Sequence, residues 1–202
     1  MNTEFELMRN ADFETLKKEV ELANWNVNAL DADGANMLFY DQPKIVEYLL
    51  TKGINIEQKD RFGNTALIIN SDDEIRKHLI QAGADVNAIN DNKRNALFYN
   101  ENAAQVQFLI DSGINVNQCD IHGRNALCYA ANKEVARVLL KAGIDMSVEI
   151  EDNDNTISIM DYLKKYRYQL VFDELLAIHE KEHIQSNIDV ENNNILGKKK
   201  RI

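Results

Sequence analysis

Apolar pairs recur along this chain every 30 residues, and a glycine follows each pair three residues later. Before each pair, further apolar residues stand three or four positions apart, which is the spacing of one face of a helix. A glycine just beyond such a stripe favours a helix end in the left-handed conformation. The pattern therefore predicts four helices that end shortly before Gly53, Gly83, Gly113 and Gly143.

A polar phrase returns at nearly the same period before each of these helices. The phrases are Asp31-Ala-Asp-Gly34, Asp60-Arg-Phe-Gly63, Asn90-Asp-Asn-Lys93 and Asp120-Ile-His-Gly123. Each phrase is followed by a second fixed element, at Asn36-Met-Leu38, Thr65-Ala-Leu67, Asn95-Ala-Leu97 and Asn125-Ala-Leu127. We expect each unit to contain a short helix, a turn, a longer helix and an extended loop. A period of this length is typical of a solenoid, in which each unit packs only against its neighbours.

The starts of two longer helices carry recognisable signals. Pro43 is the only proline and is expected in the first turn of a helix, where its missing N–H group is not needed. Ser71 and Asp72 offer side-chain oxygens that can cap the equivalent helix one unit later.

These residues resemble the ankyrin repeat family, whose phrase D-x-x-G-x-T-P-L-H precedes a helix pair and the tail L-L-x-x-G-A-D-V-N. The segment Gly83-Ala-Asp-Val-Asn87 matches that tail letter for letter. The resemblance implies an all-α solenoid of ankyrin repeats, with short helix pairs joined by β-hairpin-like loops. The units here are three or four residues shorter than the usual 33 or so, which predicts a shortened first helix or turn. The proline and histidine of the family phrase are also replaced, so a hydrogen-bonding position becomes mostly apolar.

The resemblance implies a single solenoid over residues 1–183, with about four internal repeats and a degenerate cap at each end. The expected parts are an N-terminal cap at 1–30, repeats at 31–59, 60–89, 90–119 and 120–149, and a C-terminal cap at 150–183. Residues 184–202 are expected to form a flexible tail that ends in a basic run.

Composition agrees with a single domain and adds an expectation about charge. The net charge is -10, and Lys198, Lys199, Lys200 and Arg201 contribute +4, so residues 1–197 carry -10 - 4 = -14. An acidic body repels phosphate backbones and attracts basic proteins, so we expect no direct nucleic-acid binding by the solenoid. The alternative is that the surplus carboxylates only keep the surface soluble.

The N-terminal stretch lacks a secretory signal, no apolar run could span a membrane, and only two cysteines occur, so a cytoplasmic protein is expected.

The family resemblance implies that a partner binds the concave face, which is formed by the loop tips and the first helices. The expected loop-tip contacts, with the arginines that flank them, are Asp33, Arg61, Phe62, Asn92, Arg94, Ile121, His122 and Arg124. Phe62 and Ile121 are the least expected there, because large apolar groups at a solvated turn suit a partner. Phe62 could instead fold onto the neighbouring loop.

A second set of candidates is the ladder Tyr40, Tyr99 and Tyr129, which occupies one position of successive units, with Ile69 in the unit between the first two. Tyrosines aligned along a solenoid can serve as contacts with a partner, because each offers a rigid ring and a hydroxyl. They could equally fill space between repeats.

One motif permits an enzymatic reading, which we do not favour. His179-Glu-Lys-Glu-His183 fits H-E-x-x-H, in which two histidines on one helix face bind zinc. A zinc hydrolase also needs a third ligand, and the extended motif fails at Ser186 and Asp189. We therefore expect no catalytic residues, no metal and no cofactor, and the role of Cys119 stays open.

The sequence thus favours a non-enzymatic protein-binding module, monomeric when free. Its shortened units, with Asn-Ala-Leu-Phe-Tyr at 95–99 and Gly-Ile-Asn at 113–115, resemble bacterial ankyrin proteins encoded beside antibacterial toxins. That resemblance implies an immunity role, with a basic toxin domain as a possible partner. The alternative is an adaptor, scaffold or host-directed effector that binds another protein.

Overall fold

The computed structural model describes residue 9, residues 12–22, 26–40, 42–153 and 155–166, and residues 173 and 177. Within these ranges, none of the helices combines the length and the apolar character that crossing a bilayer requires. The His179–His183 motif and the basic run at residues 198–201 lie outside the described residues.

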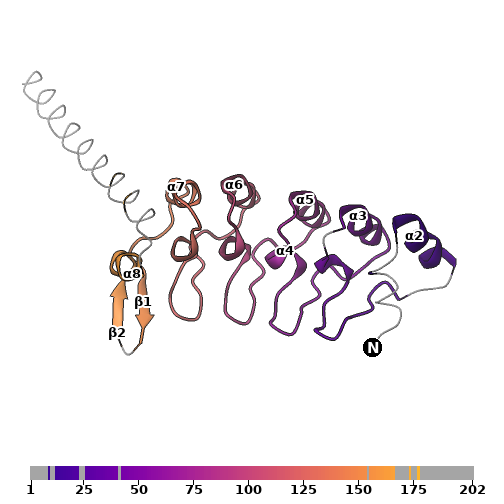
Figure 1. Cartoon of the computed structure of the whole chain (residues 1–202), viewed down its shortest axis with the longest axis horizontal. Coiled ribbons are helices and arrows are strands. Elements are labelled where there is room, and N and C mark those ends of the chain that lie inside the picture. The colour runs from indigo at the N-terminus through magenta and orange to yellow at the C-terminus, as the bar shows by residue number, and fades with distance from the viewer. Residues whose placement is uncertain are drawn as a thin grey trace, which may run out of the picture.

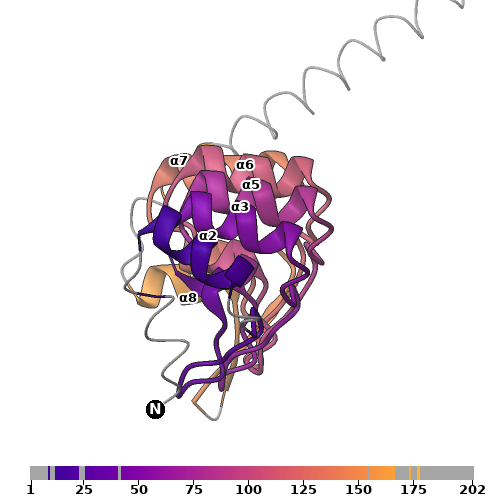
Figure 2. The ribbon, with the colours of Figure 1, turned by 90° about the vertical axis from the view of Figure 1, so that its right-hand side faces the viewer.

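Long helices form one layer of an elongated stack (Figure 1). They are α2 (Phe13–Leu22), α3 (Pro43–Thr51), α5 (Asp73–Gln81), α6 (Ala103–Asp111) and α7 (Lys133–Lys141). Viewed along the stack, the helices lie one behind another and the extended loops project to a single side (Figure 2). The solenoid expected from the sequence is confirmed.

The predicted ends of the long helices are also confirmed. Gly53, Gly83, Gly113 and Gly143 adopt φ values of 78° to 93°, a conformation that side chains disfavour. Pro43 begins α3, and the carboxylate of Asp72 accepts hydrogen bonds from the backbone N–H groups of Glu74 and Ile75 at the start of α5.

Single helical turns form a second layer between the long helices and the loops (Figure 1). They are η1 (Met37–Phe39), α4 (Ala66–Ile69), η2 (Ala96–Tyr99) and η3 (Ala126–Tyr129). Because each is only three or four residues long, the shortening expected from the 30-residue period falls on the first helix of the pair. Three of these turns begin at a buried asparagine whose side-chain oxygen caps the turn, at Asn36, Asn95 and Asn125.

The polar phrases fold into turns organised by their first residue. The Oδ1 atom of Asp60 accepts hydrogen bonds from the backbone N–H groups of Phe62 and Asn64, at 2.8 and 2.9 Å. The equivalent oxygens of Asp31, Asn90 and Asp120 accept the same pair of bonds in their own turns. A carboxylate or side-chain amide at this position therefore explains why the phrase recurs.

Each loop tip is joined to the next by one backbone hydrogen bond. The carbonyl groups of Asp33, Phe62, Asn92 and His122 accept from the N–H groups of Arg61, Asp91, Ile121 and Glu151, at 2.7 to 3.1 Å. The tips consequently form a continuous row along the stack.

The stack continues past the fourth repeat with a hairpin and a short helix. Strands β1 (Glu149–Asp152) and β2 (Asn155–Ser158) pair antiparallel, and α8 (Ile159–Lys165) follows directly. Asp152 accepts hydrogen bonds from Lys165 and Tyr166, which ties the hairpin to the end of this helix.

The apolar core consists of two clusters. One runs from α2 to α5 and contains Leu16, Leu49 and Leu79. The other runs from η2 to α8 and contains Leu109 and Leu139. Between them, α5 carries Arg76, a fully buried arginine that the sequence pattern did not predict.

Candidate protein-binding surface

The loop tips present exposed side chains of mixed character. Phe62 is 54% exposed and Ile121 is 47% exposed, although both are large apolar residues. Arg61 lies 4.7 Å from the centroid of the Phe62 ring and forms an ion pair of 2.8 Å with Asp33. Asn92 and His122 are exposed at the two following tips. The expected loop-tip contacts therefore share one edge of the stack.

The tyrosine ladder lies one layer inward, on the single-turn helices. Tyr40 and Tyr129 are half-buried, and each hydroxyl donates a hydrogen bond of 2.7 Å to the carboxylate that organises the turn of its own repeat, Asp31 or Asp120. Both hydroxyls therefore stabilise the fold, while part of each ring stays accessible. The hydroxyls of Tyr40 and Tyr129 thus give internal support, and contact of the ladder with a partner stays a prediction.

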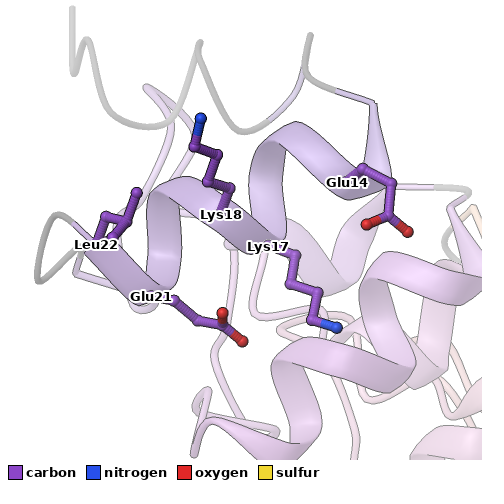
Figure 3. Close-up of a pocket in the computed structure, with 5 residues that line it drawn as sticks. All are labelled: Glu14, Lys17, Lys18, Glu21 and Leu22. Carbon is purple, nitrogen blue, oxygen red and sulfur yellow. The ribbon is translucent and has the colours of Figure 1, made fainter.

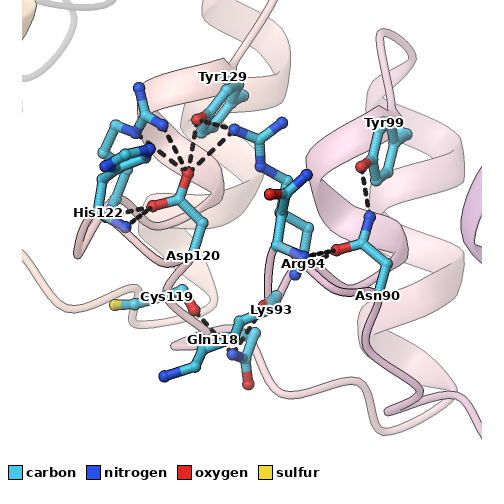
Figure 4. Close-up of polar contacts among 11 residues, drawn as sticks. Asn90, Lys93, Arg94, Tyr99, Gln118, Cys119, Asp120, His122 and Tyr129 are labelled. Atoms are coloured by element: carbon cyan, nitrogen blue, oxygen red, sulfur yellow. Dashed lines mark hydrogen bonds and ion pairs between the residues drawn. The ribbon is translucent and has the colours of Figure 1, made fainter. Parts of the chain in front are cut away.

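Arg94 and Arg124 meet at one carboxylate, that of Asp120 (Figure 4). The Oδ2 atom of Asp120 lies 3.1 Å from Nη2 of Arg94, 3.0 Å from Nη2 of Arg124 and 2.7 Å from the Tyr129 hydroxyl. The two guanidinium groups also lie 4.5 and 5.4 Å from the centroid of the Tyr129 ring. We call these four residues the Asp120 cluster.

Burial and hydrogen bonding oppose each other in the Asp120 cluster. Burial alone would raise the pKa of Asp120, but hydrogen bonds from Tyr129, Arg124 and the backbone of His122 hold that pKa below its usual value. Burial would also lower the pKa of both arginines, yet their bonds to neighbouring side chains raise the pKa of each. Asp120 and both arginines are therefore charged at neutral pH, and the cluster carries a net charge of about +1.

The described residues offer little chemistry for catalysis. Cys128 is buried, and burial raises its pKa to about 12, so its thiol stays protonated at neutral pH. Burial also raises the pKa of Cys119, and the negative charges of Asp120 and Asp145 raise it further by a smaller amount. Among the residues that the structure describes, no three histidine, cysteine or acidic side chains are grouped as a metal ion would require.

A shallow pocket lies at the opposite end of the stack from the Asp120 cluster, on α2 (Figure 3). Its lining consists of Glu14, Lys17, Lys18, Glu21 and Leu22, all from one helix. Two acids, two lysines and one leucine on a single helix offer no nucleophile with a base and no third ligand for a metal.

We did not predict from the sequence that the side chains of Asn90 and Asp120 organise their turns and bind the ladder tyrosines. Their signal was present, because both are the first residue of a polar phrase and the ladder tyrosine follows each nine positions later. The sequence could not show that Arg94 reaches the carboxylate of the next repeat, because that contact spans 26 residues.

Comparison with protein families agrees with this architecture. The sequence model of the family described as ankyrin repeats (three copies) matches residues 68–150. Residues 68–150 are ankyrin repeats, and the chain has the ankyrin-repeat fold. Proteins of this kind bind other proteins and are typically non-catalytic.

Two solved ankyrin structures resemble this chain. The immunity protein Bd3460 of Bdellovibrio bacteriovorus, solved in complex with the predatory endopeptidase Bd0816, matches with a TM-score of 0.73 and 22% identity, over 88% of this chain and 98% of that one. An ankyrin repeat domain of Acinetobacter baumannii matches with a TM-score of 0.68 and 20% identity, over 86% and 96% of the two chains. At these identities the likeness shows the ankyrin fold alone. A comparison with curated proteins found no match.

Proposed function

We propose that this ankyrin-repeat protein is a bacterial immunity protein, which neutralises a toxin by covering it and has no catalytic activity of its own. The observation that carries the proposal is the exposure of Phe62 and Ile121 on a continuous row of loop tips, because exposed apolar groups on a rigid edge suit a protein partner. The structural likeness to an immunity protein bound to an endopeptidase supports this choice of partner over an adaptor or host-directed role.

The proposed contact surface joins the loop tips to the tyrosine ladder. It contains Asp33, Tyr40, Arg61, Phe62, Asn92, Arg94, Tyr99, Ile121, His122, Arg124 and Tyr129. Because the single-turn helices and the loops are fixed by internal hydrogen bonds, most of this surface is formed before binding, which lowers the entropy lost on association.

The net charge supports a basic toxin domain as the partner. With a net charge of -10, the protein attracts a cationic partner over distances comparable to the Debye length, about 8 Å at physiological salt. We propose that the protein acts as a monomer in the cytoplasm, where its two free cysteines stay reduced.

The proposal is tested by capturing the partner from the native source with the full chain and measuring its affinity for variants. Phe62→Ala and Ile121→Ala should each weaken binding by more than about 1 kcal/mol, because each removes an exposed apolar anchor. Leu22→Ala is a matched control, since Leu22 is 73% exposed but lies on α2, away from the loop tips.

The captured protein should be inhibited in its toxic activity by a stoichiometric amount of the wild-type chain. Equal affinity for the Phe62, Ile121 and Leu22 variants would remove the loop tips from the interface. A captured partner with no toxic activity, found at a nuclear or membrane location that depends on residues 198–201, would favour the adaptor or effector role instead.

A further inference from the structure

Repeat 3 departs from its neighbours at the residue that organises its turn. The residue is aspartate in the other three repeats, at positions 31, 60 and 120, but it is Asn90 here. Asn90 is 5% exposed, and its Oδ1 atom accepts hydrogen bonds of 3.0 Å from the backbone N–H groups of Asn92 and Arg94. These two bonds fix the orientation of the side-chain amide, so its Nδ2 atom points away from the turn, toward Asn64 and Tyr99.

The amide nitrogen of Asn90 reverses the hydrogen bonding of the ladder tyrosine. Nδ2 of Asn90 donates at 2.7 Å to the hydroxyl oxygen of Tyr99 (Figure 4). It also donates at 2.7 Å to Oδ1 of Asn64. Tyr99 thus accepts a bond in the position where Tyr40 and Tyr129 donate one to a carboxylate. The hydroxyl proton of Tyr99 finds no acceptor within the described part of the chain.

Arg94 is a second donor, and the carboxylate with which it forms an ion pair, that of Asp120, belongs to the next repeat. Its guanidinium lies near Tyr99 and reaches across to Asp120, a carboxylate that already accepts from Arg124 and Tyr129. Arg94 is 22% exposed and its Nε–H group is buried without a partner, while the side chain of Asp120 is fully buried. One carboxylate therefore accepts from two guanidinium groups, and the position that organises the turn of repeat 3 carries an amide where the other three repeats carry a carboxylate.

We propose that Arg94 and the Tyr99 hydroxyl bind a carboxylate of the protein partner, from an aspartate or glutamate side chain that takes the role of the carboxylate absent at position 90. Both groups donate hydrogen bonds, and a carboxylate accepts from two donors at once with charge assistance from arginine. The inference rests on the proposed function, because it names one chemical group that the same surface recognises. It is compatible with a basic partner, since the overall charge acts on the encounter and this site on one residue.

The site can be tested before the partner is known, by nuclear magnetic resonance titration of the full chain with capped amino acids. N-acetylglutamate N-methylamide should shift the backbone amide signals of residues 94–99 in a saturable manner, with a dissociation constant on the order of 10 mM. N-acetylglutamine N-methylamide has the same shape without the charge and should give no saturable shift. N-acetylalanine, which offers only an α-carboxylate, should bind more weakly than the glutamate probe.

Three variants separate the site from general effects on the fold. Asn90→Asp supplies the missing carboxylate from within and should weaken the glutamate probe by at least about fivefold. Tyr99→Phe removes one donor and should weaken it about threefold or more. Tyr48→Phe is the control, because Tyr48 lies on α3 outside the proposed contact surface, and it should leave the affinity for the probe unchanged.

Equal shifts from the glutamate and glutamine probes, or an unchanged response in both Asn90→Asp and Tyr99→Phe, would overturn the carboxylate site. An equal response to N-acetylalanine would overturn the assignment to a side chain in favour of a chain terminus. Neither result would contradict the proposed function. That function is contradicted if no toxin is captured or if the loop tips do not contact the toxin.

Discussion

Two neighbouring junctions of the stack are built from the same positions by different means. Between α5 and α6, the buried Arg76 donates to Asn100 and, at 3.2 Å, to Gln105. Thirty positions later, between α6 and α7, the equivalent residues are Val106, Ala130 and Val135, all buried in one apolar cluster. We call the first the polar junction and the second the apolar junction. Their difference shows that a regular period fixes the geometry of a solenoid without fixing whether each interface is polar or apolar.

The polar junction contains buried hydrogen-bond donors that lack an acceptor in the part of the chain that the structure describes. The Nε and Nη2 atoms of Arg76 are buried and have no hydrogen-bond partner among the described residues. Burial lowers the pKa of this arginine to about 10, and the charge of Asp73 opposes that shift only in part. A buried cation that lacks a carboxylate destabilises an interface relative to apolar packing. The apolar clusters of the two halves of the molecule separate at this place.

An arginine placed in the apolar junction should strongly destabilise the protein. Val106→Arg should lower the free energy of unfolding by more than about 4 kcal/mol, because the new guanidinium would meet Ala130 and Val135 in place of Asn100 and Gln105. Urea denaturation followed by far-ultraviolet circular dichroism measures the change. Val106→Met is the control, since it keeps an apolar side chain at the same position. A loss below about 1 kcal/mol for the arginine variant would show that both junctions tolerate a cation equally.

Removing the shared carboxylate tests the loop side of the apolar junction. Asp120→Ala should cost about 3 kcal/mol, because it leaves Arg94 and Arg124 half-buried without their common partner. Asp60→Ala should cost only about 1 kcal/mol, because Asp60 accepts hydrogen bonds from neutral groups alone. Thermal or urea denaturation of both variants gives the difference. Equal losses would mean that the arginines gain no stability from Asp120.

The reverse exchange should improve the polar junction. In the double variant Arg76→Met with Asn100→Ala, we expect the free energy of unfolding to rise by about 1 kcal/mol, because an unbranched apolar side chain replaces an under-satisfied cation. Asn100→Ala alone is the control and should be destabilising, since it removes an acceptor from Arg76. A double variant less stable than the wild type would show that the bonds of Arg76 outweigh its burial.

Acid should weaken the apolar junction through Asp120, with the smallest effect of the four. The pKa of Asp120 lies below its usual value in the folded protein, because burial, which would raise it, is outweighed by the hydrogen bonds that its carboxylate accepts. Stability from this group is therefore fully present above pH 4 or so and is lost as the pH falls through the folded-state pKa. The difference in urea midpoint between the wild type and Asp120→Asn should shrink from pH 5 to pH 3. A constant difference would indicate that Asp120 does not titrate with folding.

Local and periodic features of the fold could be read from the sequence. The 30-residue period predicted the stack, the glycines predicted the helix ends, and Pro43 and Asp72 predicted two helix starts. These signals depend on a few adjacent residues or on repetition, both of which a single sequence displays. The shortened first helix followed from the period in the same way.

Contacts between repeats could be predicted only in part. The candidate surface was located by position within the repeat, and the exposure of Phe62 and Ile121 agrees with that choice. The burial of Arg76 was missed, because the amphipathic pattern of α5 does not reveal which polar residue faces the neighbouring helix. Sharing of Asp120 by Arg94 and Arg124 was missed for the same reason, since it depends on the distance between two repeats.

The row of loop tips separates what holds this protein together from what it displays. Each tip is joined to the next by a hydrogen bond between main-chain atoms. The first of these bonds is accepted by the carbonyl of Asp33, and the last is donated by the N–H group of Glu151. Side chains at the tips can therefore be substituted while the main-chain hydrogen bonds that join the tips are kept. Replacing Phe62 or Ile121 would therefore change the exposed surface without breaking the hydrogen bonds that join the tips.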